Sequence, residues 1–252
     1  MKCIILGSTG YHPSVSRQTA SYFLPEIGVA FDAGTGFYRL GDYLRTSRLD
    51  IFLTHAHLDH IVGLTYLSDV LRSRPDCEVC VYGEPDKLQA VEQHLFAESL
   101  FPVAPNCRFI PIPETILLPS GGRLRWRPLR HRGGAIGFRA DWADGQSIAY
   151  ISDTVALDEP DFIDFIRGVK LMLHDAYFPD SHQEKAQRTG HSTPSQVAQL
   201  AQKANIGRCV LIHTDPLITD EAIYQQDAMG LEQAKRIFSA IEVGRDFQEL
   251  DF

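Results

Sequence analysis

The sequence predicts an α/β fold in which stacked β-sheets are flanked by helices. Two observations predict it. Short apolar runs bounded by turn residues recur along the chain, and helical stretches separate some of them. The chain has 252 residues and a hydrophobic content of 44%, which is enough for a sizeable core. No stretch has the composition of an interdomain linker, so residues 1–252 are expected to form a single domain.

The expected elements follow in order. The first half holds the strand-like runs "CIILG", "ASYFL", "GVAFDAG", "DIFLTH" and "EVCVYG". Helices are expected over about 61–73 and in "EPDKLQAVEQHLF", where a proline stands near the helix start. Further strands are expected in "RFIPI", "TILLP", "RLRWRPL", "GAIGFRA" and "SIAYISD". The last third is expected to hold helices in "PDFIDFI", "TPSQVAQLAQKAN" and about 220–239, and strands in "VKLMLHDA", "RCVLIHT" and "RDFQEL".

Composition excludes several classes of protein. No run of 18 apolar residues exists, so no membrane span is expected. The first residues, "MKCIILGSTG", resemble a strand and not a signal peptide. Five scattered cysteines predict free thiols in a reducing, cytoplasmic compartment. The net charge of −8 argues against broad affinity for nucleic acid, because such affinity depends on cations.

One short stretch, "LTHAHLDHIVG", crowds His55, His57, Asp59 and His60 together after an apolar run. Imidazole nitrogens and carboxylate oxygens are ordinary zinc ligands. In an extended segment, side chains two positions apart point the same way, so His55 and His57 can grip one ion. Asp59 and His60 begin the next element, and they could hold a second ion nearby.

Two ions need more ligands, and the pattern of an apolar run followed by a ligand residue recurs along the chain. Probable strand ends carry His131, Asp153, the pair His174 and Asp175, and His213. Loops at strand ends are where rigid scaffolds commonly carry binding sites. Of these residues, we expect His174 to be a strand-end residue and not a ligand.

With these residues the chain resembles the metallo-β-lactamase-fold hydrolases, from "HAHLDH" and the downstream His131, Asp153 and His213. The resemblance implies a four-layer αββα sandwich, in which two mixed sheets lie face to face with helices outside. It also implies two divalent ions, for which zinc is expected, with manganese or iron as alternatives. One ion would be bound by His55, His57 and His131, and the other by Asp59, His60 and His213. Asp153 would bridge the two ions, and Asp32 in "FDAG" would be a buried aspartate that braces the ligand loop.

The stretch "GHSTPSQ" points to one branch of that family. Thr193 is expected to cap a helix, with Pro194 at its first position and Gln196 completing a capping box. His191 then lies just before a helix N-terminus, where anions are favoured. Together "HDAYF" and "GHSTP" resemble paired motifs of the ribonuclease Z branch. The resemblance implies that Asp175 orients a catalytic His191, that Asp59 also assists catalysis, and that His191, Ser192 and Thr193 contact substrate. The family usually has glutamate where this chain has Asp175.

The substrate expected from these features is a phosphodiester. Ribonuclease Z enzymes commonly carry a long arm between the third metal histidine and the bridging aspartate. Here His131 and Asp153 are only 22 positions apart, which fits two strands and a turn. The expected substrate is therefore a small cyclic or nucleotide-derived phosphodiester, or an RNA 3′ end if the activity is ribonuclease Z-like. The alternative is a hydrolase of lactones or thioesters that uses the same ions. The resemblance also implies a homodimer.

A row of arginines precedes His131. Arg123, Arg125 and Arg127 have period two, so in a strand they share one face. Such a row could guide a polyanion toward the metal ions. We favour the simpler interpretation, a solvated face of an edge strand.

Overall fold

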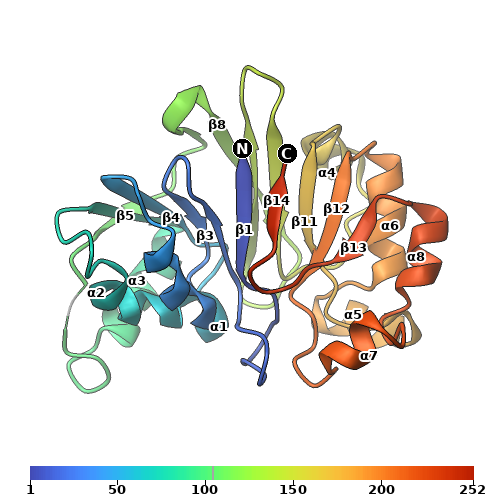
Figure 1. The fold of residues 1–252 in the computed structure, drawn as a ribbon, viewed down its shortest axis with the longest axis horizontal. Helices are drawn as coiled ribbons and strands as arrows, with labels where there is room; N and C mark the ends of the chain where they lie inside the picture. Colours follow the sequence, from blue (N-terminus) through green and yellow to red (C-terminus); the bar gives the residue numbers. More distant parts are fainter. Residues whose placement is uncertain (104) are drawn as a thin grey trace. The chain divides into compact units, whose positions relative to one another are not determined.

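The computed structural model describes residues 1–103 and 105–252, and its contacts divide them into two compact units. Unit 1 comprises residues 1–113 and 245–251, and unit 2 comprises residues 114–244 and residue 252. Each unit is built on one seven-stranded sheet with helices beside it (Figure 1). The α/β class with two mixed sheets is therefore confirmed. That residues 1–252 form a single domain stays a prediction.

The sheet of unit 1 has the strand order β14-β1-β2-β3-β4-β5-β6. Its strands are β1 (Lys2–Gly7), β2 (Ser21–Leu24), β3 (Val29–Phe31), β4 (Arg48–Phe52), β5 (Glu78–Gly83), β6 (Arg108–Pro111) and β14 (Glu249–Asp251). The pairs from β14 to β3 are antiparallel, and those from β3 to β6 are parallel. β3 and β4 are buried except for Arg48, as expected of parallel strands covered on both faces.

Short helices cover one face of this sheet beside β3, β4 and β5 (Figure 1). They are η1 (Thr35–Asp42), α1 (Leu58–Ile61), η2 (Val62–Tyr66), α2 (Leu67–Val70), α3 (Pro85–Ala90) and η3 (Val91–Leu95). Phe37, Leu64, Val70 and Leu88 pack against the strands in the main apolar cluster of this unit. That cluster fixes the loop between β4 and α1, which carries the histidine motif.

The sheet of unit 2 has the order β13-β12-β11-β10-β9-β8-β7. Its strands are β7 (Thr115–Leu117), β8 (Arg123–Leu129), β9 (Ala135–Asp141), β10 (Ser147–Ile151), β11 (Leu171–Asp175), β12 (Arg208–Ile212) and β13 (Ile241–Val243). Strands β7 to β10 pair antiparallel, whereas β10 to β13 pair parallel. Because these strands are parallel, the carboxyl ends of β10, β11 and β12 lie side by side at one end of the sheet.

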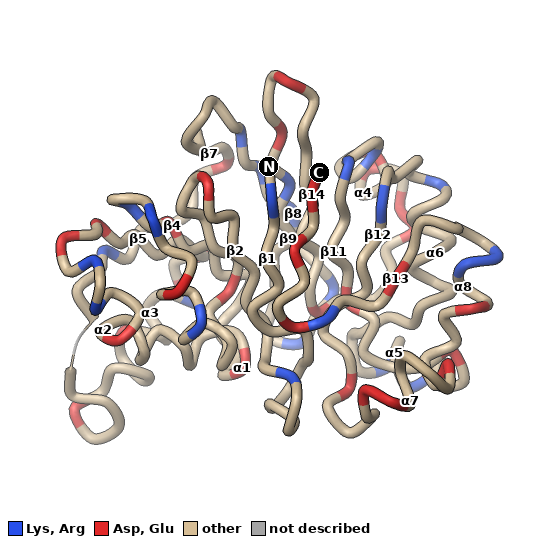
Figure 2. The backbone as a smooth tube through the Cα atoms, in the orientation of Figure 1, with Lys and Arg blue, Asp and Glu red and all other residues tan. Residues whose placement is uncertain are grey.

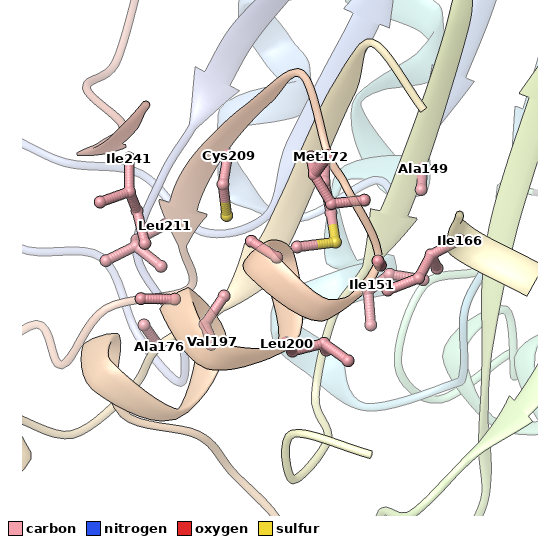
Figure 3. Packing of buried hydrophobic residues seen from close by; sticks show 14 of the residues in the cluster. Ala149, Ile151, Ile166, Met172, Ala176, Val197, Leu200, Cys209, Leu211 and Ile241 are labelled. Carbon is pink, nitrogen blue, oxygen red and sulfur yellow. The ribbon is translucent and has the colours of Figure 1, made fainter. Parts of the chain in front are cut away.

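The helices of unit 2 bury an apolar stripe on that sheet. They are η4 (Pro119–Gly121), α4 (Pro160–Ile166), η5 (Asp180–His182), α5 (Gln183–Thr189), α6 (Pro194–Lys203), α7 (Asp220–Tyr224) and α8 (Leu231–Ile237). In α6 the buried positions Val197, Ala198, Leu200 and Ala201 recur at helical spacing. Val197 and Leu200 lie against Met172 and Leu211 of the sheet (Figure 3). This packing holds the N-terminus of α6 near the strand ends.

Most expected elements are present, and the differences have local causes. The expected helix over 61–73 begins earlier, at α1, and is broken into three short pieces. The expected helix over 220–239 is two helices, because Asp227 and Gly230 adopt positive φ values of 51° and 85° between them. Strand β13 was not expected, since three residues are too few to show an alternating pattern. Among the described residues, no helix combines the length and the apolar character that a bilayer span requires.

Candidate metal centre

In unit 1 a buried aspartate organises the histidine motif. Asp32 directly follows β3, beside the parallel strand β4, and its backbone N–H donates to the Phe52 carbonyl at 3.0 Å. Its carboxylate accepts three hydrogen bonds, from the Thr54 N–H at 2.7 Å, the Thr54 hydroxyl at 2.8 Å and His60 Nδ1 at 2.7 Å. Asp32 is fully buried and holds Thr54 and His60, as expected for an aspartate that braces the ligand loop.

These hydrogen bonds determine which ring nitrogens of unit 1 can act as ligands. A carboxylate only accepts, so His60 Nδ1 and the Thr54 hydroxyl both donate to Asp32. The Thr54 oxygen must then accept from His55 Nδ1, which lies 2.9 Å away. Both histidines are therefore protonated at Nδ1, and each keeps a lone pair at Nε2. This is the tautomer that a metal-binding imidazole needs.

The remaining residues of the motif lie around these two rings. The His55 ring centre is 4.4 Å from that of His57 and 4.3 Å from that of His60. His57 has extended backbone at the start of α1, and Asp59 follows in its first turn. Asp59 Oδ2 lies 3.4 Å from His60 Nε2. The structure thus brings all four residues of the motif together within unit 1.

In unit 2 one carboxylate stands between two histidines. Asp153 Oδ2 lies 3.3 Å from His131 Nε2, and Asp153 Oδ1 lies 3.1 Å from His213 Nε2. His131 Nδ1 donates to the Gly190 carbonyl at 3.3 Å, which leaves its Nε2 with a lone pair. Burial lowers the pKa of His131, so the ring is neutral at pH 7. Nitrogen and oxygen donors of this kind suit zinc.

Backbone strain accompanies these ligand positions. Asp32, Asp153 and His213 have φ values of 54°, 53° and 54°, in the left-handed region that L-residues seldom adopt. Each follows a strand by one or two residues: Asp32 follows β3, Asp153 follows β10, and His213 follows β12. Strained residues of this type cluster at functional sites, because the surrounding fold must hold them in place.

Also in unit 2, Asp175 contacts His191. Asp175 Oδ2 accepts from His191 Nδ1 at 2.7 Å, so the shorter aspartate arm makes the contact directly. The carboxylate also accepts from the backbone N–H groups of Tyr177 at 2.8 Å and Thr154 at 3.2 Å. One ligand atom each from Asp153, His191 and His213 lies within 4.8 Å of the others. His191 therefore has one nitrogen on Asp175 and its ring beside two candidate metal ligands.

The residues that follow His191 begin α6 as expected. Thr193 is the N-cap, Pro194 occupies the first turn, and the Thr193 N–H donates to Gln196 Oε1 at 3.1 Å. The Ser192 hydroxyl donates to the Thr154 carbonyl at 2.7 Å. Both Ser192 and Thr193 are buried. Their contact with substrate stays a prediction.

Several contacts were not expected from the sequence. The Tyr177 ring centre lies 4.9 Å from that of His191 and 5.7 Å from that of His213. Thr154 joins the loop after β10 to the end of β11 through its bond to Asp175. The position of Tyr177, two residues after Asp175 in "HDAYF", is the one signal in the sequence that could have revealed it.

The arginine row on β8 is largely solvated. Arg123, Arg125 and Arg127 are exposed on one face, Leu124 on the other face is buried, and Trp126 there is half-buried. Arg125 pairs with Asp141 at 3.2 Å, and the Arg127 guanidinium lies 5.8 Å from the Phe165 ring centre. Basic and acidic residues are interspersed along the strands and helices of both units (Figure 2). These contacts agree with the simpler interpretation of the row.

Comparison with known proteins places the chain in a family. Residues 29–214 match the family model described as "Beta-lactamase superfamily domain". Ribonuclease Z of Archaeoglobus fulgidus is 24% identical over 99% of this chain and 97% of its own length. The metallo-beta-lactamase fold protein YhfI from Bacillus subtilis superimposes with a TM-score of 0.81, at 17% identity over 99% of both chains. Human tRNase Z, short form, superimposes with a TM-score of 0.75, at 21% identity over 100% of this chain and 99% of its own.

The matched region contains every metal ligand expected from the sequence, from His55 to His213, and also Asp32. The superpositions cover almost the whole of each chain. The chain therefore has the metallo-β-lactamase fold and belongs to the beta-lactamase superfamily.

Proposed function

We propose that the protein is a metal-dependent phosphodiesterase of the ribonuclease Z-like branch. The observation that carries the proposal is the Asp175–His191 contact of 2.7 Å beside the candidate ligands Asp153 and His213. A carboxylate-oriented histidine next to metal ligands suits protonation of a leaving alcohol. Ribonuclease Z relatives that align with nearly the full chain give further support.

The proposed ligands are those that family membership implies. His55, His57 and His131 would hold one divalent ion, and Asp59, His60 and His213 would hold the other, with Asp153 as a ligand that both would share. The donor chemistry in each unit fits such ions, since His55, His60 and His131 all present Nε2 lone pairs. When bound, the ions supply Lewis acidity and a water of lowered pKa. Zinc is the proposed metal, and the same ligands accept manganese or iron.

The chain's own residues would handle the protons. His191 Nδ1–H donates a hydrogen bond to Asp175. The proton that passes to the leaving oxygen would therefore be carried by Nε2. The buried Asp175 carboxylate stabilises the imidazolium form and fixes the ring orientation. Asp59, at the start of α1, is the proposed acceptor of the nucleophile's proton. Backbone N–H groups at the α6 N-terminus, after Ser192 and Thr193, favour a phosphate beside His191.

The proposed substrate is a small cyclic or nucleotide-derived phosphodiester, or an RNA 3′ end. Between His131 and Asp153 the chain forms only β9, β10 and their turn. The alignment with the Archaeoglobus ribonuclease Z spans 307 positions, which exceeds the 252 residues of this chain. The relative therefore has segments without a counterpart here. A short chain that lacks an arm suits a small substrate better than a whole tRNA.

Hydrolysis of lactones or thioesters is the second candidate. The same ligand residues would serve a carbonyl substrate, because both reactions need an activated water and a stabilised oxyanion. The Asp175–His191 contact favours phosphorus, since a carbonyl reaction needs no second acid beside the ions to expel a good leaving group.

The first experiment measures hydrolysis of bis(p-nitrophenyl) phosphate by protein reloaded with zinc or manganese. The His191→Ala variant is compared with His182→Ala, which alters an exposed histidine. We expect metal-dependent turnover that falls by about 10²-fold or more in His191→Ala and is unchanged in His182→Ala. Metal content, measured in both variants, should equal that of the wild type. Loss of metal from His191→Ala would instead make His191 a ligand, as its closeness to Asp153 and His213 allows.

Absence of turnover in protein that holds about two ions would contradict a phosphodiesterase and favour carbonyl substrates.

A cytoplasmic location is proposed from the unpaired state of all five cysteines. A homodimer, implied by the family resemblance, would be measured by light scattering of the metal-loaded protein.

A further inference from the structure

The loop between β1 and β2 presents an exposed aromatic ring beside a proposed metal ligand. The Tyr11 side chain is 72% exposed, although tyrosine usually buries part of its ring. Its backbone N–H donates to Asp59 Oδ2 at 2.7 Å. Tyr11 also adopts a φ of 62°, which a bulky residue rarely does. The Tyr11 backbone is thus held at Asp59, while its side chain stays open to solvent.

The ring itself has a defined orientation. It stands edge-on to the His12 ring, with the ring centres 5.1 Å apart and the planes at 61°. His12 Nδ1 donates to the Pro13 carbonyl at 2.9 Å, which restrains that neighbour. In a T-shaped contact with one neighbour, at least one face of the Tyr11 ring stays uncovered, and a flat ligand can stack on that face.

The base of the loop is anchored within unit 1. Asp246 accepts hydrogen bonds from the Ser8 N–H at 2.9 Å, the Ser8 hydroxyl at 2.7 Å and the Gln18 N–H at 2.8 Å. Arg39 forms a buried ion pair with the same carboxylate. Thr9 and Gln18 are joined by a backbone hydrogen bond of 3.0 Å. An anchored loop limits the entropy lost when Tyr11 binds a ligand.

The loop also lacks permanently charged side chains. Residues 8–16, "STGYHPSVS", contain no Asp, Glu, Lys or Arg. Val15, on the same loop, is fully exposed. The loop beside Asp59 therefore carries no permanent charge, which suits a planar base better than the phosphate group itself.

We propose that Tyr11 is a stacking subsite for a nucleobase attached to the phosphate that is hydrolysed. The inference rests on the proposed phosphodiesterase function and narrows its substrate to nucleotide-derived diesters. Stacking of a base on an aromatic side chain is sequence-tolerant, because every base has a flat face. Tyr11 should accordingly favour nucleotides over simple alkyl diesters without selecting one base.

The test compares two diesters that share a leaving group, thymidine 5′-p-nitrophenyl phosphate and methyl p-nitrophenyl phosphate. The metal-loaded wild type, Tyr11→Ala and Tyr11→Phe are assayed on both. Each variant keeps the backbone N–H that contacts Asp59. We expect Tyr11→Ala to lose about fivefold or more in kcat/KM for the thymidine diester and to keep its activity on the methyl diester. Tyr11→Phe should retain the wild-type preference, and Leu117→Ala, which truncates an exposed side chain of β7, should change neither rate.

Equal losses on both diesters would overturn the proposal, because Tyr11 would then act only by placing Asp59. Unchanged rates in Tyr11→Ala would overturn it as well. If the wild type hydrolyses neither diester, the proposed function fails, and calorimetric binding of thymidine 5′-monophosphate and inorganic phosphate decides the subsite. Weaker binding of the nucleotide alone in Tyr11→Ala would support the subsite, and equal binding of the nucleotide by both proteins would refute it.

Discussion

Each unit pairs a buried aspartate with a histidine, and the proposed roles of the two pairs differ. In unit 1, Asp32 Oδ2 accepts from His60 Nδ1 at 2.7 Å, and in unit 2, Asp175 Oδ2 accepts from His191 Nδ1 at 2.7 Å. Each carboxylate is fully buried and accepts further N–H groups from its own unit. The two pairs therefore fix the ring orientation and the tautomer of their histidines in the same way.

They differ in the exposure of the histidine. The His60 side chain is fully buried, whereas 13% of the His191 side chain is accessible. A buried ring with a fixed lone pair suits a permanent ligand. A ring that solvent can reach can exchange a proton with substrate and be reprotonated afterwards. We therefore propose that the exposure of the imidazole, and not the aspartate contact, separates a pair that orients a metal ligand from a pair that transfers a proton.

The largest expected effect comes from Asp175→Asn. The amide keeps the size of the side chain but removes the charge that stabilises a protonated His191. We expect kcat for bis(p-nitrophenyl) phosphate to fall by about 10²- to 10⁴-fold with unchanged metal content. Asp144→Asn, an exposed turn position between β9 and β10, is the matched control. If metal content falls along with kcat, the two pairs serve the same purpose and the comparison fails.

Asp32→Asn should lower metal affinity and should leave most of kcat intact when metal is in excess. An amide cannot accept from the Thr54 N–H, the Thr54 hydroxyl and His60 Nδ1 together, so at least one donor loses its acceptor. We expect metal affinity to fall by about 10- to 100-fold, measured by competition with a chromogenic chelator. Excess metal should then restore most of kcat. A kcat that stays low at saturating metal would show that Asp32 acts in turnover.

Tyr177 sharpens the comparison in unit 2, because its ring lies against that of His191 with the ring centres 4.9 Å apart. Its ring is tilted by 31° over His191, which restricts the imidazole and shields one face from water. We expect Tyr177→Ala to lower kcat by about two- to tenfold and Tyr177→Phe to retain it. The basic limb of the pH profile for kcat, where the general acid loses its proton, should also move in Tyr177→Ala. A lower kcat without that movement would assign Tyr177 to folding alone.

The proposed site residues of unit 1 were easier to predict from the sequence than those of unit 2. The proposed ligands of unit 1 are adjacent in "HAHLDH", because the loop after β4 and the first turn of α1 supply them all. His131, Asp153 and His213 lie far apart in the sequence and were predicted because each follows an apolar run and fits the family's order. The contacts of Thr154 and Tyr177 with Asp175 were not predicted. The Tyr177 contact is a local turn two residues after Asp175. The Thr154 contact depends on the parallel pairing of Ile151 with His174, and strand order is a tertiary property that composition and periodicity do not encode.

The smallest expected effect concerns His174, a buried histidine of unit 2 whose ring bonds to a backbone carbonyl. It is fully buried, its Nδ1 donates to the Asp175 backbone carbonyl at 2.8 Å, and its Nε2 has no hydrogen-bond partner among the described residues. Its register neighbours Ile151 and Leu211 belong to the apolar cluster under α6. Burial therefore lowers the pKa of His174.

Because the folded state keeps His174 neutral, acid favours the unfolded chain. An unfolded histidine takes up a proton near pH 6.5, so the contribution of His174 is complete above that pH and is lost as the pH falls toward the folded-state value. Over that range the free energy of unfolding should decrease by about 1.4 kcal/mol per pH unit more in the wild type than in His174→Asn. Urea unfolding between pH 8 and pH 5 measures the difference, with His182→Asn as the exposed control. Parallel curves for wild type and His174→Asn would mean that His174 is protonated in the folded protein, and that its ring has a partner as His60 and His191 do.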